Sequence, residues 1–238
     1  NGMVWHPPFS ASRHRSPRRM NSSVELTWMK ALRTRVRALA WLKAMGNTLF
    51  LVVFFQLYLW IQKHPAYEVV QIPATAIDRW IGFQPWTIGL YLSLWVYTAL
   101  PVALQPDRAR LVRYCGAITL LCAVGLLTFY FWPSSVSDAI GVRPAGSALF
   151  NMLYAVDSNG NACPSLHVAA SVMSCMWLYA ILRQIRSPAW LNLLNVVWCA
   201  GIVFSTMATK QHLLLDVLAG AALGMLGGWL SLRRAAPV

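Results

Sequence analysis

Residues 114–132 read YCGAITLLCAVGLLTFYFW and contain no charged side chain. A helix of this length crosses the hydrocarbon core of a membrane, which is about 30 Å thick. Only helices satisfy their own backbone groups while crossing lipid singly, so the class predicted is all-α. Five further apolar blocks follow the same rule and predict a polytopic membrane protein with a bundle of six transmembrane helices. They lie at residues 44–62, 86–104, 166–182, 190–208 and 213–232.

The composition agrees with this prediction. Of 238 residues, 58% are hydrophobic and 11% are charged, whereas a soluble domain usually carries about 25% charged residues. Five cysteines is an odd number, and four of them lie inside apolar blocks, so no disulfide framework is implied. Three glycines recur every fourth residue of the last block and predict close helix contact. They are Gly220, Gly224 and Gly228.

The basic residues are divided unevenly between the two ends of the predicted helices. Sixteen of the twenty Lys and Arg residues fall at one end of the predicted helices. They lie before the first block, between the second and third blocks, between the fourth and fifth blocks, or at the C-terminus. The other side holds only Lys63, Arg79, Arg143 and Lys210. Because cytoplasmic loops carry the excess of Lys and Arg, both termini are predicted to be cytoplasmic. A multi-pass protein of a bacterial inner membrane fits best, and the net charge of +13 does not predict a nucleic-acid partner.

The chain before the first block divides into two parts. Residues 1–21 are rich in Pro, Ser and Arg, and they are predicted to form a disordered basic tail without a visible signal peptide. Residues 22–43 predict a basic amphipathic helix on an anionic membrane surface, because apolar and basic residues fall on opposite faces. Residues 44–234 remain as the six-helix domain.

Ionisable residues gather at two places on the side that is predicted to face outward. The fourth block begins with CPSLH at 163–167, and the turn between the fifth and sixth blocks reads STMATKQHLLLD at 205–216. Ionisable groups at a membrane boundary are costly and indicate function. On a helix, His212 and Asp216 share a face, so the carboxylate can accept from one imidazole nitrogen and leave the other with a free lone pair. His167 follows a Pro-Ser helix start, where backbone N–H groups attract anions.

Taken singly, each of these residues has a simpler interpretation that is favoured. His212 and Asp216 can be a helix cap or an interface pair. His167 can be an interfacial histidine, and Arg143 and Lys210 can anchor the protein to lipid head groups. The combination of all of them on one membrane face is what points to a single site.

The order Arg143-Pro144, then Pro-Ser-x-His ending at His167, then Ser-x6-His-x3-Asp over 205–216 closely resembles the type 2 phosphatidic acid phosphatase superfamily. The resemblance covers roughly residues 45–232. The superfamily includes membrane lipid phosphatases, lipid phosphotransferases of the inositol phosphorylceramide synthase kind and vanadium haloperoxidases. This sequence has Val136 where the first motif has Lys, and Thr206 where the third has Arg. These departures favour the inositol phosphorylceramide synthase-like branch.

The resemblance implies a mechanism. His212 would attack phosphorus and form a phosphohistidine, Asp216 would hold the tautomer of His212, and His167 would act as general acid. The phosphate would be bound by four further residues: Arg143, Ser165, Lys210 and Ser205. Neither a metal nor a cofactor is expected, since no second carboxylate is positioned for a dinuclear site.

The partners implied are therefore a lipid phosphate or diphosphate and the membrane lipids. The favoured function is cleavage of that phosphomonoester or diphosphate in the extracytoplasmic leaflet. A phosphotransferase that passes the phosphoryl or phospho-headgroup to a second hydroxyl is a close alternative. A lipid or anion transporter is a remote one, and a haloperoxidase disagrees with six spans because such enzymes are soluble.

Overall fold

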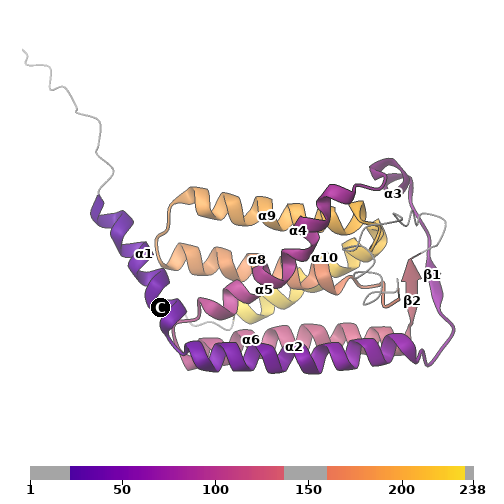
Figure 1. The fold of residues 1–238 in the computed structure, drawn as a ribbon, viewed down its shortest axis with the longest axis horizontal. Helices are drawn as coiled ribbons and strands as arrows, with labels where there is room; N and C mark the ends of the chain where they lie inside the picture. Colours follow the sequence, from indigo (N-terminus) through magenta and orange to yellow (C-terminus); the bar gives the residue numbers. More distant parts are fainter. Residues whose placement is uncertain (1–21, 137–159, 234–238) are drawn as a thin grey trace, which may run out of the picture.

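The computed structural model describes residues 22–136 and 160–233, so the predicted disordered tail at 1–21 and Arg143 lie outside the described residues. The predicted all-α class is confirmed (Figure 1). Within these described ranges, six helical segments are long and apolar enough to cross a membrane, and the chain is a multi-pass membrane protein. The helices are α1 (Ser22–Arg37), α2 (Ala40–Lys63), α3 (Ala76–Ile81), η1 (Pro85–Thr87), α4 (Ile88–Leu92), α5 (Leu94–Ala103), α6 (Arg108–Phe131), α8 (Leu166–Gln184), α9 (Ala189–Ala208) and α10 (Leu214–Arg233).

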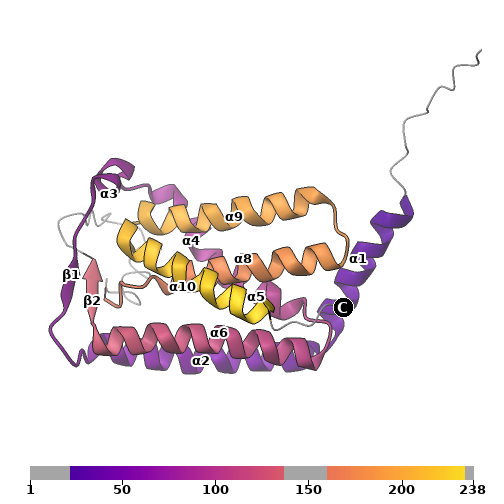
Figure 2. The ribbon, with the colours of Figure 1, turned by 180° about the vertical axis from the view of Figure 1, so that it is seen from behind.

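The long helices run side by side, with α2 and α6 along one side of the bundle and α9 along the other (Figures 1 and 2). Helices α5, α8 and α10 lie between them. At one end of the bundle are α3 and two short strands, β1 (Val70–Ile72) and β2 (Ser134–Val136). At the other end is α1. We call these the α3 end and the α1 end.

The start of the first span differs from the prediction. Helix α1 ends at Arg37, and Leu39 adopts a left-handed conformation (φ 55°) that turns the chain before α2 begins at Ala40. Residues 40–43 therefore belong to the first membrane-spanning helix and not to the predicted interfacial helix. Lys43 is buried there, and its Nζ donates to the carbonyls of Arg35 (2.7 Å) and Ala103 (2.8 Å).

The second span is assembled from η1, α4 and α5, where the sequence predicts one uninterrupted helix. The interruption lies at Ser93, whose Oγ donates to the carbonyl of Leu90 at 2.6 Å. A serine that bonds back to its own helix commonly bends it. The bend matters for the site because it places Tyr91 of α4 beside the start of α8.

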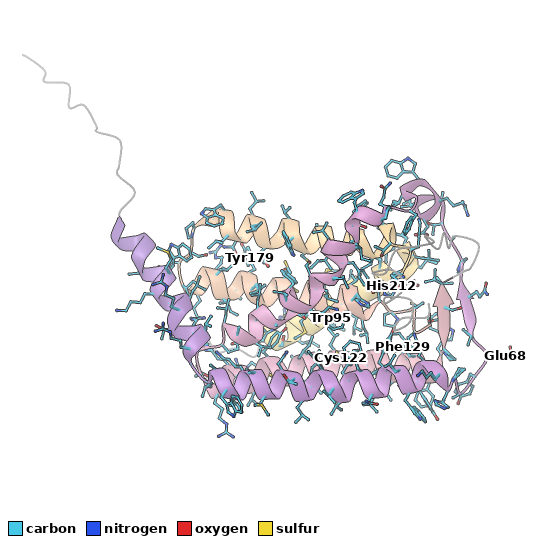
Figure 3. The ribbon with its side chains drawn as sticks, viewed as in Figure 1. Glu68, Trp95, Cys122, Phe129, Tyr179 and His212 are labelled. Carbon is cyan, nitrogen blue, oxygen red and sulfur yellow. The ribbon has the colours of Figure 1, made fainter. Side chains whose placement is uncertain are left out.

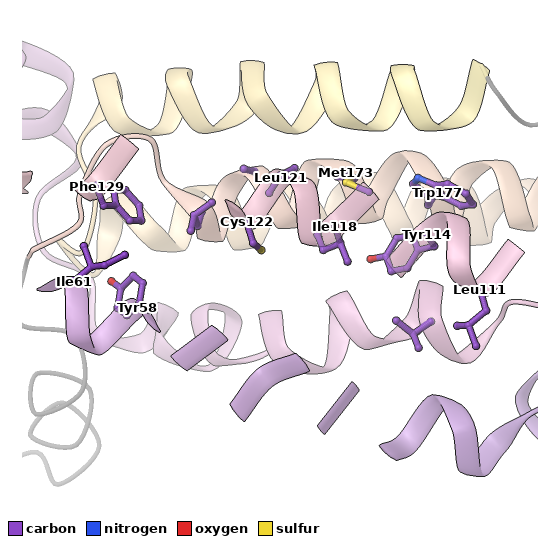
Figure 4. Packing of buried hydrophobic residues seen from close by; sticks show 13 residues of the cluster. Tyr58, Ile61, Leu111, Tyr114, Ile118, Leu121, Cys122, Phe129, Met173 and Trp177 are labelled. Carbon is purple, nitrogen blue, oxygen red and sulfur yellow. The ribbon is translucent and has the colours of Figure 1, made fainter. Parts of the chain in front are cut away.

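A cluster of buried side chains holds α2, α6 and α8 together (Figure 4). Tyr58 of α2, Phe129 of α6 and Met173 of α8 belong to it, and all three are buried. Helix α10 packs along α8, and the predicted glycine contact is confirmed. A β-carbon at Gly220 or Gly224 would collide with the backbone of α8. These helices approach so closely because the glycines carry no side chain.

The two strands form a small parallel sheet that the sequence does not predict, with Gln71 paired to Ser135. Each strand has three residues, too few for an alternation signal. The sheet joins the segment that follows α2 to the segment that follows α6. It thereby fixes the backbone at the α3 end, close to the start of α8.

Candidate active site

The N-termini of α8 and α10 meet at the α3 end of the bundle (Figure 1). Ser165 caps α8, since its Oγ accepts from the amide of Val168 at 3.3 Å. The amide of Ser165 also donates to the carbonyl of Asp216 at 3.1 Å, which joins the two helix starts directly. Because helix N-termini carry partial positive charge, this junction suits an anion.

The turn between α9 and α10 holds His212 through the main chain. The amides of Gln211 and His212 both donate to the carbonyl of Thr206, each at 3.1 Å. Lys210 makes the turn possible by adopting a left-handed conformation (φ 59°). Ser205 is buried, and its Oγ donates to the carbonyl of Ile202 at 2.6 Å. The turn is therefore internally bonded and fixes the position of the His212 backbone.

Two imidazoles face each other at this junction. Nε2 of His212 lies 3.3 Å from Nδ1 of His167. On the other side of the His212 ring, Nδ1 lies 3.8 Å from Oδ2 of Asp216, which also accepts from the amide of Leu213 at 2.9 Å. A separation of 3.8 Å is an ion-pair distance and too long for a hydrogen bond. The helix-face prediction for this pair is wrong, because α10 begins at Leu214 and His212 lies in the turn before it, so the turn and not a shared helix face brings the two side chains close.

Tyr91 completes the surroundings of His167, and the sequence did not single it out. Its hydroxyl lies 2.9 Å from Nε2 of His167, and the two ring centroids are 4.9 Å apart. Trp95 packs its ring edge-on to the same imidazole, with centroids 6.1 Å apart. His167 thus has Tyr91 on one nitrogen and His212 on the other, so its ring orientation is set by two partners.

Lys210 is buried, and its Nζ donates to the backbone carbonyl of Asp78 at 2.6 Å. Burial lowers the pKa of Lys210, and the nearby charge of Asp78 opposes that shift. The Asp78 carboxylate accepts from the amide of Leu214 at 2.8 Å through Oδ1 and caps α3 through Thr75. Asp78, also missed by sequence reasoning, therefore connects α3 to both ends of the turn that carries His212.

A sequence model of the PAP2 superfamily matches residues 110–236, more than half of the chain. The matched segment contains both histidines of the junction and Asp216. The chain belongs to the PAP2 superfamily. Neither the search of curated proteins nor the search of solved structures found a match.

The structure brings the three predicted catalytic residues of this PAP2 protein together: His167, His212 and Asp216. Ser165 lies beside them, but its hydroxyl is occupied by the cap of α8. Ser205 lies in the last turn of α9 and Lys210 in the turn that follows, and the side chain of each donates a hydrogen bond to a main-chain carbonyl. Within 22–136 and 160–233, no group of three or more His, Cys, Asp or Glu side chains is placed to hold a metal ion.

A half-open cavity of about 910 Å³ begins at the two histidines of the PAP2 site. His167, His212 and Tyr91 line its α3 end, and apolar side chains of α2, α5 and α6 line most of the rest. Figure 3 places His212 and Phe129 toward the end of the bundle where Glu68 lies, whereas Cys122 lies nearer the middle. A cavity of this size is large enough for a bound small molecule or lipid chain.

Proposed function

We propose that this PAP2 protein cleaves the phosphomonoester or diphosphate of a membrane lipid through a phosphohistidine on His212. The observation that carries the proposal is the 3.3 Å separation between Nε2 of His212 and Nδ1 of His167 at the mouth of an apolar cavity. The two rings are in contact, so a phosphate that binds between them has a nucleophile on one side of its phosphorus and a proton donor on the other. Membership of the PAP2 superfamily supports the same chemistry.

In the first step, the lone pair on Nε2 of His212 attacks phosphorus. The N–P bond forms while the P–O bond to the lipid breaks, and the lipid oxygen takes a proton from Nδ1 of His167. We assign the proton to Nδ1 because Nε2 of His167 faces Tyr91. Asp216, 3.8 Å from Nδ1 of His212, keeps the proton on that nitrogen and stabilises the charge that the ring gains.

In the second step, water attacks the phosphohistidine. His167, now without its proton, accepts one from that water, the N–P bond breaks and phosphate leaves. The enzyme returns to its starting protonation state, so both half-reactions use the same two rings.

The equatorial phosphate oxygens need positive charge as the reaction proceeds. We propose that Arg143, Lys210 and Ser165 contribute, together with the N-termini of α8 and α10. Ser205 has a single O–H donor, which the Ile202 carbonyl accepts, so Ser205 contributes only if its hydroxyl turns away from that carbonyl. The ammonium of Lys210 has three donors, and the Asp78 carbonyl uses one of them.

We also propose that the active site faces the extracytoplasmic side of a bacterial inner membrane. The support is the distribution of charge between the ends of the bundle. Among the described residues, Lys63, Arg79 and Lys210 belong to the α3 end, while the α1 end holds a larger basic set. That set comprises Lys30, Arg33, Arg35, Arg37, Lys43, Arg108, Arg110, Arg113, Arg183, Arg186 and Arg233.

The test is incubation of the purified protein with a total lipid extract, followed by mass spectrometry of the lipids and measurement of free phosphate. Hydrolysis predicts that a phosphorylated lipid disappears, its dephosphorylated form appears and phosphate is released. The variant His212→Ala should do none of this. The matched control is His64→Ala, since His64 is exposed and, among the described residues, its ring binds and stacks on Trp60 of α2, away from the two histidines.

Two other results would overturn the proposal. Transfer of the phosphate to another lipid, with no free phosphate, would identify a phosphotransferase of the inositol phosphorylceramide synthase-like kind. If the wild-type protein leaves all lipid species unchanged, cleavage is excluded and the transporter alternative is favoured.

A further inference from the structure

The cavity that begins at the histidines continues along the bundle toward the α1 end. Leu42 and Tyr58, near the start and the end of α2, both line it, as do Arg108 and Phe129 of α6. At about 1.5 Å per residue, the lining of α2 alone extends for about 24 Å. Half of the hydrocarbon core measures about 15 Å, so the cavity passes well beyond the middle of the membrane.

The lining between the two ends is mostly apolar, and its polar side chains, such as Asn47, Thr98 and Thr119, are uncharged. The apolar part includes Phe50 and Phe54 of α2, Trp95 of α5, and Ile118 and Cys122 of α6. No charged side chain is among the described lining residues between Lys43 and Arg108 at the α1 end and the histidines at the α3 end. The interior of the cavity therefore suits a hydrocarbon and offers no charge to a second head group.

One of the cations at the α1 end of the cavity, Lys43, already has hydrogen-bond partners. Lys43 lines the cavity there, yet its Nζ donates to the carbonyls of Arg35 and Ala103. A lysine with two short hydrogen bonds to carbonyls does not require an anionic ligand. Lys43 is therefore not a second phosphate site.

We propose that this cavity binds a single long hydrocarbon chain of the substrate, with the phosphate at His212 and the chain end near Gly46 and Lys43. The inference rests on the proposed function. With carbon–carbon bonds of about 1.5 Å, an extended chain advances about 1.25 Å per carbon, so about 20 carbons fill 24 Å. The substrate class is therefore a lipid phosphate or diphosphate whose chain exceeds the depth of one leaflet.

We expect the cavity to select substrates by how well the length of the hydrocarbon chain matches the length of the cavity. Lipid tails are as apolar as the lining, so moving a chain from the bilayer into the cavity brings no hydrophobic gain. A chain that fills the cavity instead gains van der Waals contacts along its whole length. A short chain contacts only part of the lining and gains fewer of them.

Two glycines allow a matched test. A β-carbon at Gly46 or at Gly116 would meet nothing within 4 Å, so a larger side chain fits sterically at both sites. Gly46 lines the cavity near its α1 end, and Gly116 of α6 does not line it. Gly46→Phe should therefore obstruct the cavity, whereas Gly116→Phe places the same ring outside it.

The measurement is the rate of phosphate release from decyl phosphate and from eicosyl phosphate in mixed micelles. A decyl chain ends short of Gly46, and an eicosyl chain passes it. The wild type and Gly116→Phe should prefer the eicosyl substrate. In Gly46→Phe the ratio of eicosyl to decyl turnover should fall about tenfold, the effect of overfilling a packed site.

A second measurement does not depend on the variants. Eicosyl phosphate with a photoreactive group at its chain end should label the start of α2 around Lys43, and the decyl analogue should label α2 near Phe50. Identical chain-length ratios in the two glycine variants, or identical labelling by the two probes, would overturn the chain site alone. Failure of the wild type to release phosphate from either substrate would overturn the proposed function and this inference with it.

Discussion

Tyr91 and His167 are joined by a contact of 2.9 Å between the tyrosine hydroxyl and the imidazole Nε2. The two residues come from α4 and α8, and they are 76 positions apart in the chain. The contact places Nε2 of His167 on Tyr91 and leaves Nδ1 facing His212, and Nδ1 is the nitrogen that we propose as the proton donor.

The first prediction concerns this contact. Tyr91→Phe keeps the ring that packs on His167 and removes the hydroxyl that stabilises its protonated form. Formation of the phosphoenzyme should slow roughly tenfold or more for an alkyl phosphate, since hydrogen bonds to charged groups contribute about 1.5–3 kcal/mol. An activated aryl phosphate needs little protonation, so its rate should change much less.

The matched control is Tyr97→Phe, because the hydroxyl of Tyr97 is also buried but binds Asn195 of α9. Single-turnover rates for both substrates give the result. An equal loss with alkyl and aryl substrates in Tyr91→Phe would assign the hydroxyl to packing and not to proton transfer.

The second prediction concerns the division of labour between the histidines. His167→Ala lacks the general acid, so an activated aryl phosphate should partly restore its turnover. His212→Ala lacks the nucleophile and should be inactive with every substrate. Acid-labile phosphoenzyme, trapped during turnover of the aryl substrate, should form in His167→Ala and be absent in His212→Ala. Phosphoenzyme in His212→Ala would show that the roles are assigned wrongly.

The third prediction concerns Asp216, which is buried behind His212. Asp216→Asn keeps the size of the side chain but removes its charge, so the imidazolium-like ring of the phosphohistidine loses its counter-ion. Turnover should fall between those of wild type and His212→Ala for alkyl and aryl substrates alike, because the defect lies in the nucleophile. Selective rescue by the aryl substrate would instead place Asp216 with the general acid.

The fourth prediction concerns Lys210. Burial lowers the pKa of this lysine from the ordinary value of 10.5. At pH values between the lowered pKa and 10.5, the unfolded chain binds more protons than the folded chain. The free energy of unfolding should therefore rise with pH across this window. Below the lowered pKa, where Lys210 is protonated in both states, it should not change with pH on account of this residue. Lys210→Met should remove the rise, while Lys63→Met, at an exposed site, should keep it. Melting temperatures in detergent over an alkaline pH series provide the measurement, and parallel slopes in all three proteins would contradict it.

The fifth prediction concerns sidedness. Glu68 and Arg186 are exposed at the α3 end and the α1 end of the bundle, respectively. In intact spheroplasts, an impermeant thiol reagent should label Glu68→Cys, and it should label Arg186→Cys only after lysis. Native Cys163 adds little background, because burial and then the charge of Asp216 raise its pKa to about 11. The reverse labelling pattern would place the active site in the cytoplasm.

The sequence by itself determined the membrane class and the six spans, because crossing lipid depends on the length and polarity of each segment taken alone. It also determined that Gly220 and Gly224 allow close helix contact, because they are a property of one helix with a fixed period. The sequence paired His212 with Asp216 correctly, but it placed both on a helix that in fact begins only at Leu214. The motif order placed His167 in the same site before any contact was known.

Only the tertiary structure decided the rest, because it depends on contacts between distant segments. Tyr91 is one aromatic residue among many until the bend at Ser93 brings it to His167. Asp78 meets Lys210 across 132 positions. The cavity exists only because α2, α5 and α6 leave space between them, and no local pattern encodes the space between packed helices.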